Sequence, residues 1–300
     1  MAGWIIPPRW KGLSLELILA NVLNGISYAF ILFLIASGLS LVFGVMGILN
    51  LAHGALYMLG AFIGLTAAVH WDNFLVGVVV AAIGLGAVGL VLDRLFLSRL
   101  YKQFNEQALL TLGLVYIFAN VVTWIWGPWS KIGKIPAMLA GSMSIGDFNF
   151  SIYRFAIIAI GLVIFGFLWY LQDKTRIGAR IRAGMDNKEM TIGLGINYGM
   201  LSTAVFILGA VMGGVAGFLG APIIGAFPEM SMDILLLAMI VVVVGGLGNI
   251  QGALLGSIII GIIDTFGKAY FPNFATFTVY CIFIIMLLVK PTGLLGRKRI

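Results

Sequence analysis

Long apolar runs separated by short polar segments dominate the sequence. A membrane-spanning helix needs roughly 20 predominantly apolar residues, at a rise of about 1.5 Å per residue. Runs of about this length lie at 17–43, 51–69, 74–92, 107–127, 153–171, 197–224 and 273–289, and one more apolar block covers 233–263. The pattern predicts an all-α polytopic membrane protein with about eight transmembrane segments.

Basic residues gather in a few of the polar segments, and this bias predicts orientation. Short loops rich in Lys and Arg stay on the cytoplasmic side of a membrane. Three segments are basic: DRLFLSRLYKQ, with Arg94, Arg99 and Lys102; DKTRIGARIRAGMDNKE, with Lys174, Arg176, Arg180, Arg182 and Lys188; and the tail KPTGLLGRKRI. We expect all three to be cytoplasmic. Counting spans backward then puts 70–73 and the N-terminus outside, against the mild opposing signal of Arg9 and Lys11.

Composition agrees with a membrane protein and leaves no room for a second domain. Hydrophobic residues make up 61% of the chain and charged residues only 10%, where a soluble protein has about a quarter charged. No polar stretch reaches the ~50 residues that a soluble domain needs. We predict a single transmembrane permease domain over 1–300, with a cytoplasmic loop at about 172–196. The opening MAGWIIPPRWKG leads into a first span and shows no clear signal-cleavage site.

Two glycine-rich breaks interrupt the apolar pattern. The block 233–263 must begin and end on one face, yet its 31 or so residues are too few for two full spans. Its centre, GGLGNIQG, predicts a hairpin of two short helices, with arms of about a dozen residues, meeting inside the membrane. The other break is GVMGILNLAHG at 44–54. The stretch after it, GALYMLGAFIG, resembles GALLGSIIIG at 252–261, although small-residue helices also match by chance.

Glycine-interrupted segments in corresponding positions of two halves point to a transport site near the midplane. Non-helical backbone at membrane depth is tolerated only where protein buries it or water lines it. The expected residues of a substrate path are Gly47, Asn50, His53, Gly54, Gly246, Gly248, Asn249 and Gln251. The alternative is that Asn50 and His53 satisfy backbone groups at a helix end, or lie at the cytoplasmic surface.

A third glycine pattern predicts packing and not chemistry. Gly209, Gly213 and Gly217 recur at steps of four in FILGAVMGGVAGFLGAP. Small residues at i and i+4 let two helices approach closely in a membrane. We expect this face to pack against another helix of the chain or of a partner.

Several signatures of enzymes are missing from the sequence. It contains no GxxxxGK[ST], HExxH or CxxC, so we expect no catalytic residue, metal or cofactor in this chain. Glu16, Asp233 and Asp264 fall near the ends of the apolar blocks. Ion-driven carriers usually keep an ionisable residue inside the membrane. This pattern weighs against a secondary carrier, and energy would then enter through the cytoplasmic loop.

Part of that loop resembles a coupling sequence. Permeases of ABC importers carry a loop of the pattern EAAxxxG, and EMTIGLG is similar to it at Glu189, Thr191 and Gly195, with Met190 and Thr191 in place of the alanines. Four segments occur in order: SGLSLVFGVMGILNLAHGALYMLGAF, RAGMDNKEMTIGLGIN, VVVVGGLGNIQGALLGSIIIG and KPTGLLG. Together, over about 20–296, they resemble the LivH kind of permease in the branched-chain amino acid ABC import family.

The resemblance implies an ABC importer permease fold in a bacterial inner (plasma) membrane. It implies a LivM-like second permease or a second copy, two cytoplasmic ATPase subunits that use the ATP, and an extracytoplasmic substrate-binding protein, with no nucleic acid. A short helix around 184–195 would transmit ATPase movement. The residues expected to take part are Arg180, Arg182, Gly184, Lys188, Glu189 and Gly195. Branched-chain or other hydrophobic amino acids are the expected substrates. The alternatives are urea or short amides, or an ATP-independent carrier or channel for a small neutral solute.

Overall fold

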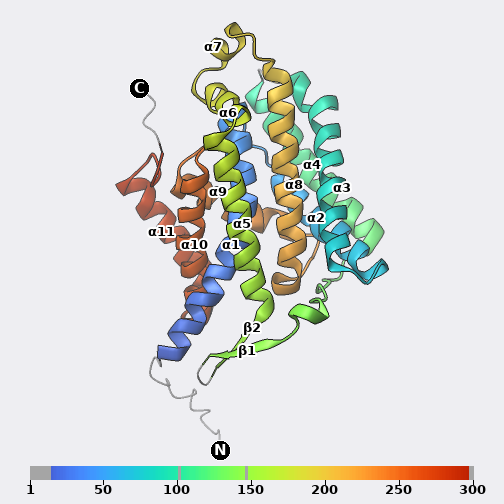
Figure 1. Ribbon diagram of the computed structural model, residues 1–300, viewed down its shortest axis with the longest axis vertical. Helices are drawn as coiled ribbons and strands as arrows, with labels where there is room; N and C mark the ends of the chain where they lie inside the picture. Colours follow the sequence, from blue (N-terminus) through green and yellow to red (C-terminus); the bar gives the residue numbers. More distant parts are fainter. Residues whose placement is uncertain (1–14, 101–102, 146–147, 297–300) are drawn as a thin grey trace, which may run out of the picture.

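The computed structural model describes residues 15–100, 103–145 and 148–296. The expectations for Arg9, Lys11, Lys102 and the last four residues of the basic tail lie outside these ranges. Almost all of the described chain is helical, as Figure 1 shows. Its helices are α1 (Leu15–Met46), α2 (His53–His70), α3 (Phe74–Leu95), α4 (Phe104–Trp126), α5 (Ile152–Lys174), α6 (Arg176–Asp186), α7 (Lys188–Gly193), α8 (Tyr198–Ile224), α9 (Met230–Gly245), α10 (Ile250–Tyr270) and α11 (Ala275–Val289).

Eight helical segments of the described chain are long and apolar enough to cross a membrane, as the sequence predicted. Short elements complete the chain: the 3-10 turns η1 (Leu97–Leu100), η2 (Ala137–Leu139) and η3 (Pro272–Phe274), and the strands β1 (Ser142–Ile145) and β2 (Phe148–Ser151). The strands pair antiparallel in a hairpin, with Met143 opposite Phe150. An all-helical polytopic protein is therefore confirmed.

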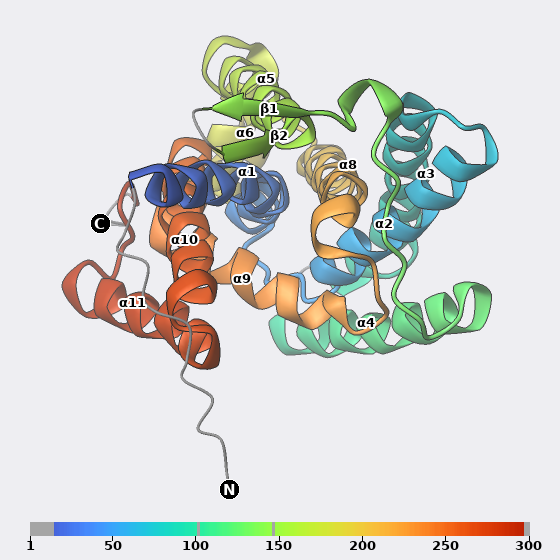
Figure 2. The same cartoon turned by 90° about the horizontal axis from the view of Figure 1, so that it is seen from below.

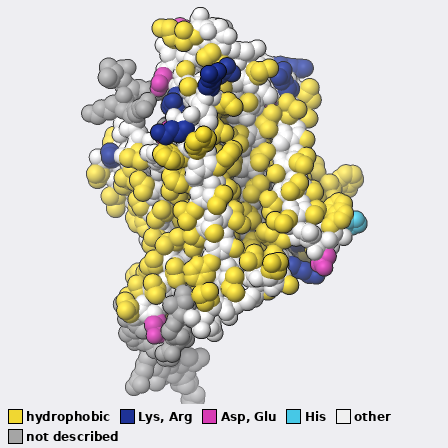
Figure 3. All heavy atoms as spheres, viewed as in Figure 1, with side chains coloured by type: hydrophobic (Ala, Val, Ile, Leu, Met, Phe, Trp, Pro, Cys, Tyr) yellow, Lys and Arg dark blue, Asp and Glu magenta, His cyan; other side chains and the backbone are white. Residues whose placement is uncertain are grey.

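The two ends of the bundle differ in what they carry. Helices α6 and α7 lie at one end, at the top of Figure 1, and the β1–β2 hairpin lies at the other. We call these the α6 end and the hairpin end. Lys and Arg side chains gather at the α6 end in Figure 3, above a largely hydrophobic surface. The last described residues, Leu295 and Gly296, line the same cavity as Arg182 of α6. The basic loop and the end of the described chain are thus on the same side.

Helices α1, α2 and α8 form the centre of the bundle. In their apolar stretches 83%, 72% and 78% of residues are buried, against 17% in α5 and 11% in the segment that contains α11. Small residues allow this close packing: a Cβ added to Gly60 of α2 would collide with the backbone of Gly214 on α8. In lipid the apolar surface gives little driving force, so helices associate through such close packing. The weakly buried helices form the periphery.

The block 233–263 differs from its expected form. It contains α9, with 16 residues, and α10, with 21, which is long enough to span a membrane. The prediction of two arms of about a dozen residues is wrong, because the helices continue past the charged residues that suggested their ends. Asp264 stays inside α10, 5% exposed, and its Oδ2 lies 2.5 Å from Nζ of Lys268 one turn later. The pair lets the helix run on to Tyr270.

Candidate functional site

The first break lies between α1 and α2. Gly47 has φ of +68°, a left-handed conformation that glycine adopts without strain. The chain is non-helical from Gly47 to Ala52. Within it Oδ1 of Asn50 accepts a hydrogen bond from the Ala52 backbone N–H at 3.1 Å. The Leu51 N–H donates to Thr111 Oγ1 of α4 at 3.3 Å. Side chains therefore satisfy part of the irregular backbone.

The end of this break reaches deep into the bundle. His53 is fully buried, and its Nε2 lies 3.1 Å from the carbonyl oxygen of Ile35 in α1. Ile35 precedes the end of α1 at Met46 by about 16 Å of helix rise. On the other side His53 faces α8, where a Cβ on Gly213 would lie 3.5 Å from Nε2. Residues 47–52 thus lead from the α6 end to the interior, and His53 does not lie at the surface.

Three polar atoms near the break have no hydrogen-bond partner in the described chain. They are Nδ2 of Asn50, Nδ1 of His53 and the hydroxyl of Tyr57. Asn50 is 1% exposed, and the other two side chains are fully buried. A buried polar group without a partner costs about 1–3 kcal/mol. All three unpartnered groups are therefore energetically unfavourable where they lie.

The second break, residues 246–249, is a tight turn at the α6 end. Gly246 and Gly248 have φ of +107° and +77°. Asn249 caps α10, its Oδ1 accepting from the Gly252 N–H at 3.0 Å, while its Nδ2 donates to the Leu295 carbonyl at 3.0 Å. The N–H groups of Leu294 and Leu295 donate to the carbonyls of Val244 and Gly245. The C-terminal segment holds this turn at the end of the bundle and not at the midplane.

Of the 44–54 break, only Gly44 at its start shares a cavity with the second break. A cavity of 830 Å³ at the α6 end is lined by Gly248, Asn249 and Gln251 from the second break, and by Phe43 and Gly44 from the end of α1. A smaller one of 360 Å³ is lined by Gly47. Asn50, His53, Gly54 and Gly246 line neither. The structure thus brings together only part of the expected path, and Gly44 is shared by both cavities.

Helix α6 connects the breaks. A Cβ on Gly44 would lie 2.6 Å from Cε of Met185 on α6 and 3.0 Å from Cα of Gly248. Buried Gly184 lets Leu201 of α8 and Val45 of α1 approach α6. The Tyr198 hydroxyl, at the start of α8, donates to the Val45 carbonyl. Helix α6 therefore contacts both the end of α1 and the 246–249 turn.

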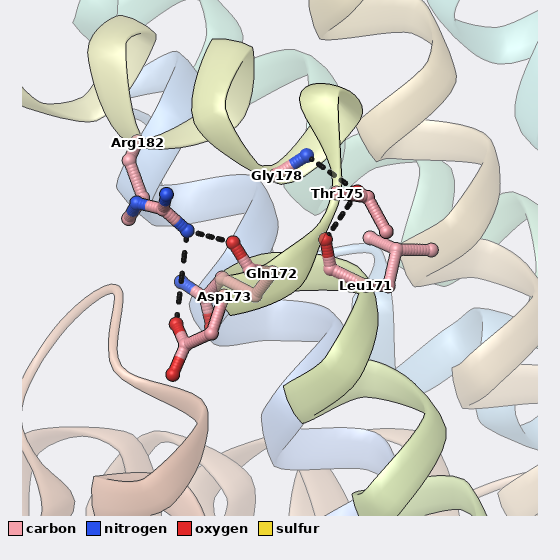
Figure 4. Close-up of polar contacts among 6 residues, drawn as sticks. All are labelled: Leu171, Gln172, Asp173, Thr175, Gly178 and Arg182. Atoms are coloured by element: carbon pink, nitrogen blue, oxygen red, sulfur yellow. Dashed lines mark hydrogen bonds and ion pairs between the residues drawn. The ribbon is translucent and has the colours of Figure 1, made fainter.

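Arg182 ties α6 to α5, as Figure 4 shows. Its guanidinium donates to the Gln172 carbonyl and lies 3.7 Å from Asp173 Oδ1. At the bend between the helices, Thr175 Oγ1 accepts from the Gly178 N–H at 3.1 Å and donates to the Leu171 carbonyl at 2.5 Å. Arg182 was expected to face an ATPase; one nitrogen of its guanidinium makes these contacts within the chain, and the side chain is 35% exposed. It fixes the angle between α5 and α6.

The expected single helix over 184–195 is divided in two. Asn187 separates α6 from α7, with φ of −155°, and its Oδ1 accepts from the Met190 N–H at 2.9 Å. Such a side-chain cap begins a new helix. Gly184 therefore packs inside α6 and does not share a helix with Lys188 and Glu189. Gly195, with φ of +77°, follows the end of α7.

Helix α7 presents an exposed surface of mixed character. Met190, Ile192 and Leu194 are 63%, 52% and 68% exposed. Glu189 is exposed beside them, as is Arg180 on α6. Lys188 lies over the Tyr198 ring, 4.8 Å from its centroid. Exposed large apolar residues grouped at a surface mark an interaction site.

The small-residue pattern of α8 packs inside the chain. Gly209 lies against Gly38 and Val42 of α1, Gly213 against His53, and Gly217 against the backbone of Tyr57 on α2. This face of α8 therefore holds the two helices that flank the first break. It is not available to a partner subunit.

Three residues at this site were not predicted from the sequence. Tyr57 follows His53 by one helical turn, a spacing that places both on one face of α2. That spacing could have indicated it. Met185 and Tyr198 contact α1 residues far away in the sequence, and no local pattern signals them.

Comparison with known proteins gives a consistent result. Residues 21–290 match the family described as branched-chain amino acid transport system / permease component. The chain is 28% identical to the high-affinity branched-chain amino acid transport system permease protein BraD of Pseudomonas aeruginosa, over 94% of this chain and 97% of the relative. It is 29% identical to LivH of Escherichia coli K12, over 94% and 96%, and to a probable LivH of Methanocaldococcus jannaschii, over 92% of each. No solved structure matches.

The helical fold, the broken connection between α1 and α2 and the family match define a multi-pass membrane permease. The chain belongs to the family of permease components of branched-chain amino acid transport systems.

Proposed function

We propose that the chain is the membrane-spanning permease subunit of an ATP-driven importer of branched-chain or other hydrophobic amino acids. It would lie in a bacterial inner membrane with the α6 end, and hence the C-terminus, in the cytoplasm. The basic residues at the α6 end support this orientation. The curated relatives are named as branched-chain amino acid permeases, and this supports the substrate class.

One observation carries the proposal: α6 contacts both breaks through Met185, Gly44 and Gly248, while adjacent α7 exposes an apolar and charged surface. An ATPase subunit bound to α7 would move α6, and α6 would move the end of α1 and the 246–249 turn. Glu189 and Arg180 are exposed there and are the charged groups we assign to the ATPase contact. The chain itself binds no ATP in this proposal.

The substrate path would include the first break. Unpartnered polar atoms of Asn50 and His53 could receive the ammonium or carboxylate group of an amino acid once the bundle opens. The apolar core that holds His53, including Ile35, suits an apolar side chain. Gly47 would provide the flexible end of this segment and Gly54 the closely packed end. The gate at the α6 end would be formed by Gly246, Gly248, Asn249 and Gln251.

The proposal is tested by purifying the tagged chain gently from its native membrane and identifying what copurifies. We expect two ATPase subunits and a second permease, either LivM-like or a second copy. In liposomes, with an extracytoplasmic binding protein, this assembly should take up radiolabelled leucine only with ATP.

Two other outcomes of this experiment would change the proposal. Uptake of urea or a short amide and not of leucine would change the substrate class but keep the ATP-driven mechanism. If the chain purifies alone and moves a solute without ATP, it is a carrier or channel, and the coupling role of α6 and α7 is refuted.

A further inference from the structure

The outward face of α4 differs from that of an ordinary lipid-facing helix. One row of its exposed positions recurs every three or four residues, on one side of the helix. The row is Glu106, Leu109, Gly113, Tyr116, Asn120 and Thr123, and the exposed apolar residues Ile117, Trp124 and Ile125 lie beside it. The amide nitrogen of Asn120 donates to the Tyr116 carbonyl at 2.8 Å, but its Oδ1 accepts no hydrogen bond from the described chain. An exposed amide oxygen inside a spanning segment is unfavourable in lipid.

Helices α3 and α5, also at the periphery, lack such a stripe. On α3 the exposed residues between its ends are apolar: Leu75, Val79, Ile83, Ala87, Leu90 and Val91. On α5 they are Ala159, Leu162, Val163, Phe167, Trp169 and Tyr170. These two faces suit lipid. The contrast within one chain indicates that the face of α4 meets something other than lipid.

Helix α9 gives a second, independent indication on the same side of the bundle. It has 16 residues, about 24 Å of rise, less than the ~30 Å thickness of the hydrocarbon core. Asp233, in the first turn of α9, is exposed. A charged group on a helix too short to cross the membrane suits a water-lined or protein-covered surface. Figure 2 shows α9 and α4 along one edge of the bundle, opposite α5.

The first break lies between these two helices. Leu51 donates its N–H to Thr111 of α4, and a Cβ on Gly54 would collide with the carbonyl of Ser231 on α9. The segment with Asn50 and His53 is thus directly behind the α4–α9 edge. Helix α4 is held chiefly through α2, by the Trp126 Nε1–H bond to Thr66 Oγ1 at 2.7 Å and the Phe62–Trp126 ring contact.

We propose that the α4–α9 face binds the second permease subunit, whose spanning helix packs on the stripe at Gly113 and hydrogen-bonds to Asn120. The inference rests on the proposed function, which requires two permeases. A glycine permits close approach of a helix, and an exposed amide pairs with a polar residue of that helix in a membrane. The substrate path would then run between the two permeases, beside the 47–54 break. A soluble partner does not fit, because the stripe lies within the span.

The test is photo-cross-linking of the complete transporter in its native membrane. A photoreactive phenylalanine analogue replaces Tyr116 or, as matched control, Phe167 on the apolar face of α5; these side chains are 62% and 57% exposed. We expect the Tyr116 variant to give a covalent adduct of about twice the subunit mass that contains permease peptides, whether of a second copy or of a related chain. The Phe167 variant should give lipid adducts only.

A second comparison uses two glycines with open space around them. A Cβ on Gly113 or on Gly166 of α5 would meet nothing within 4 Å, so both Gly113→Leu and Gly166→Leu should fold. We expect Gly113→Leu to reduce copurification of the second permease about tenfold, a loss of about 1.4 kcal/mol in binding. Gly166→Leu should leave it unchanged.

Several outcomes would overturn the assignment. These are lipid adducts alone at Tyr116, adducts to an ATPase or binding protein there, equal permease adducts at Phe167, or equal copurification of both leucine variants. If the wild-type complex holds no second permease, the proposed function fails as well. If a second permease copurifies but cross-links elsewhere, only the α4–α9 assignment fails.

Discussion

The side chain of Met185 on α6 lies against the backbone of Gly44 on α1. A Cβ on Gly44 would approach Met185 Cε within 2.6 Å and Sδ within 3.2 Å, with Cα of Gly248 at 3.0 Å. Three segments far apart in the sequence therefore meet at one glycine. The contact joins α6 to both interrupted parts of the membrane domain, as the proposed coupling requires.

Replacing Gly44 by Val should uncouple ATP hydrolysis from transport. The added methyl groups force Met185 and Gly248 away, which separates α6 from the 246–249 turn. In liposomes we expect leucine uptake to fall at least about tenfold, about 1.4 kcal/mol in barrier, while the ATPases still copurify. Gly166→Val, at a position with open space, is the control. Full uptake in the Gly44 variant would contradict a role for this contact.

Charge reversal at Glu189 should weaken coupling without unfolding the membrane part. The side chain is exposed on α7 and makes no salt bridge within the described chain, so Glu189→Arg changes only the outer surface. We expect lower transport-coupled ATPase activity and an unchanged thermal unfolding temperature. Lys174→Glu, an equal charge change at the exposed end of α5, is the matched control. Normal uptake by Glu189→Arg would exclude the coupling role.

Two alanine substitutions on one face of α8 should differ sharply in stability. A Cβ at Gly217 would collide with the backbone of Tyr57, whereas one at Gly213 would make ordinary contact with His53, at 3.5 Å. Overpacking costs about 1–3 kcal/mol, so Gly217→Ala should unfold at clearly lower temperature in detergent. Gly213→Ala should stay close to wild type. Equal unfolding temperatures would show that α2 and α8 can separate at no cost.

Replacing His53 by Leu should remove transport and preserve the fold. Leucine removes the unpartnered Nδ1 of a fully buried ring, which relieves one cost, and the Nε2 contact with the Ile35 carbonyl, which adds a cost of similar size. We expect an unchanged unfolding temperature with uptake reduced at least about tenfold, about 1.4 kcal/mol. If the variant instead unfolds early and a conservative His53→Asn variant transports normally, His53 serves only to hold the break.

Much of the architecture follows from local sequence. Whether a segment can span a membrane depends on its own length and apolarity, so the spans near 17–43, 197–224 and 273–289 match α1, α8 and α11 closely. The breaks at Gly47 and at Gly246 to Gly248 were also predictable, since positive φ favours glycine. The order of motifs also indicated the family that the comparison identified.

Only the tertiary structure decided how deep each break lies and what it touches. The Gly248 N–H donates to Ser40 Oγ across 208 positions, and Asn249 reaches Leu295 across 46; no local pattern encodes contacts between such distant segments. These contacts hold the second turn at the α6 end, while the carbonyl of Ile35 receives His53 in the interior. In the same way, the pairing of Arg182 with α5 depends on how α5 and α6 bend together. Local hydrophobicity determines which segments enter the membrane, and packing between them determines where their polar groups lie.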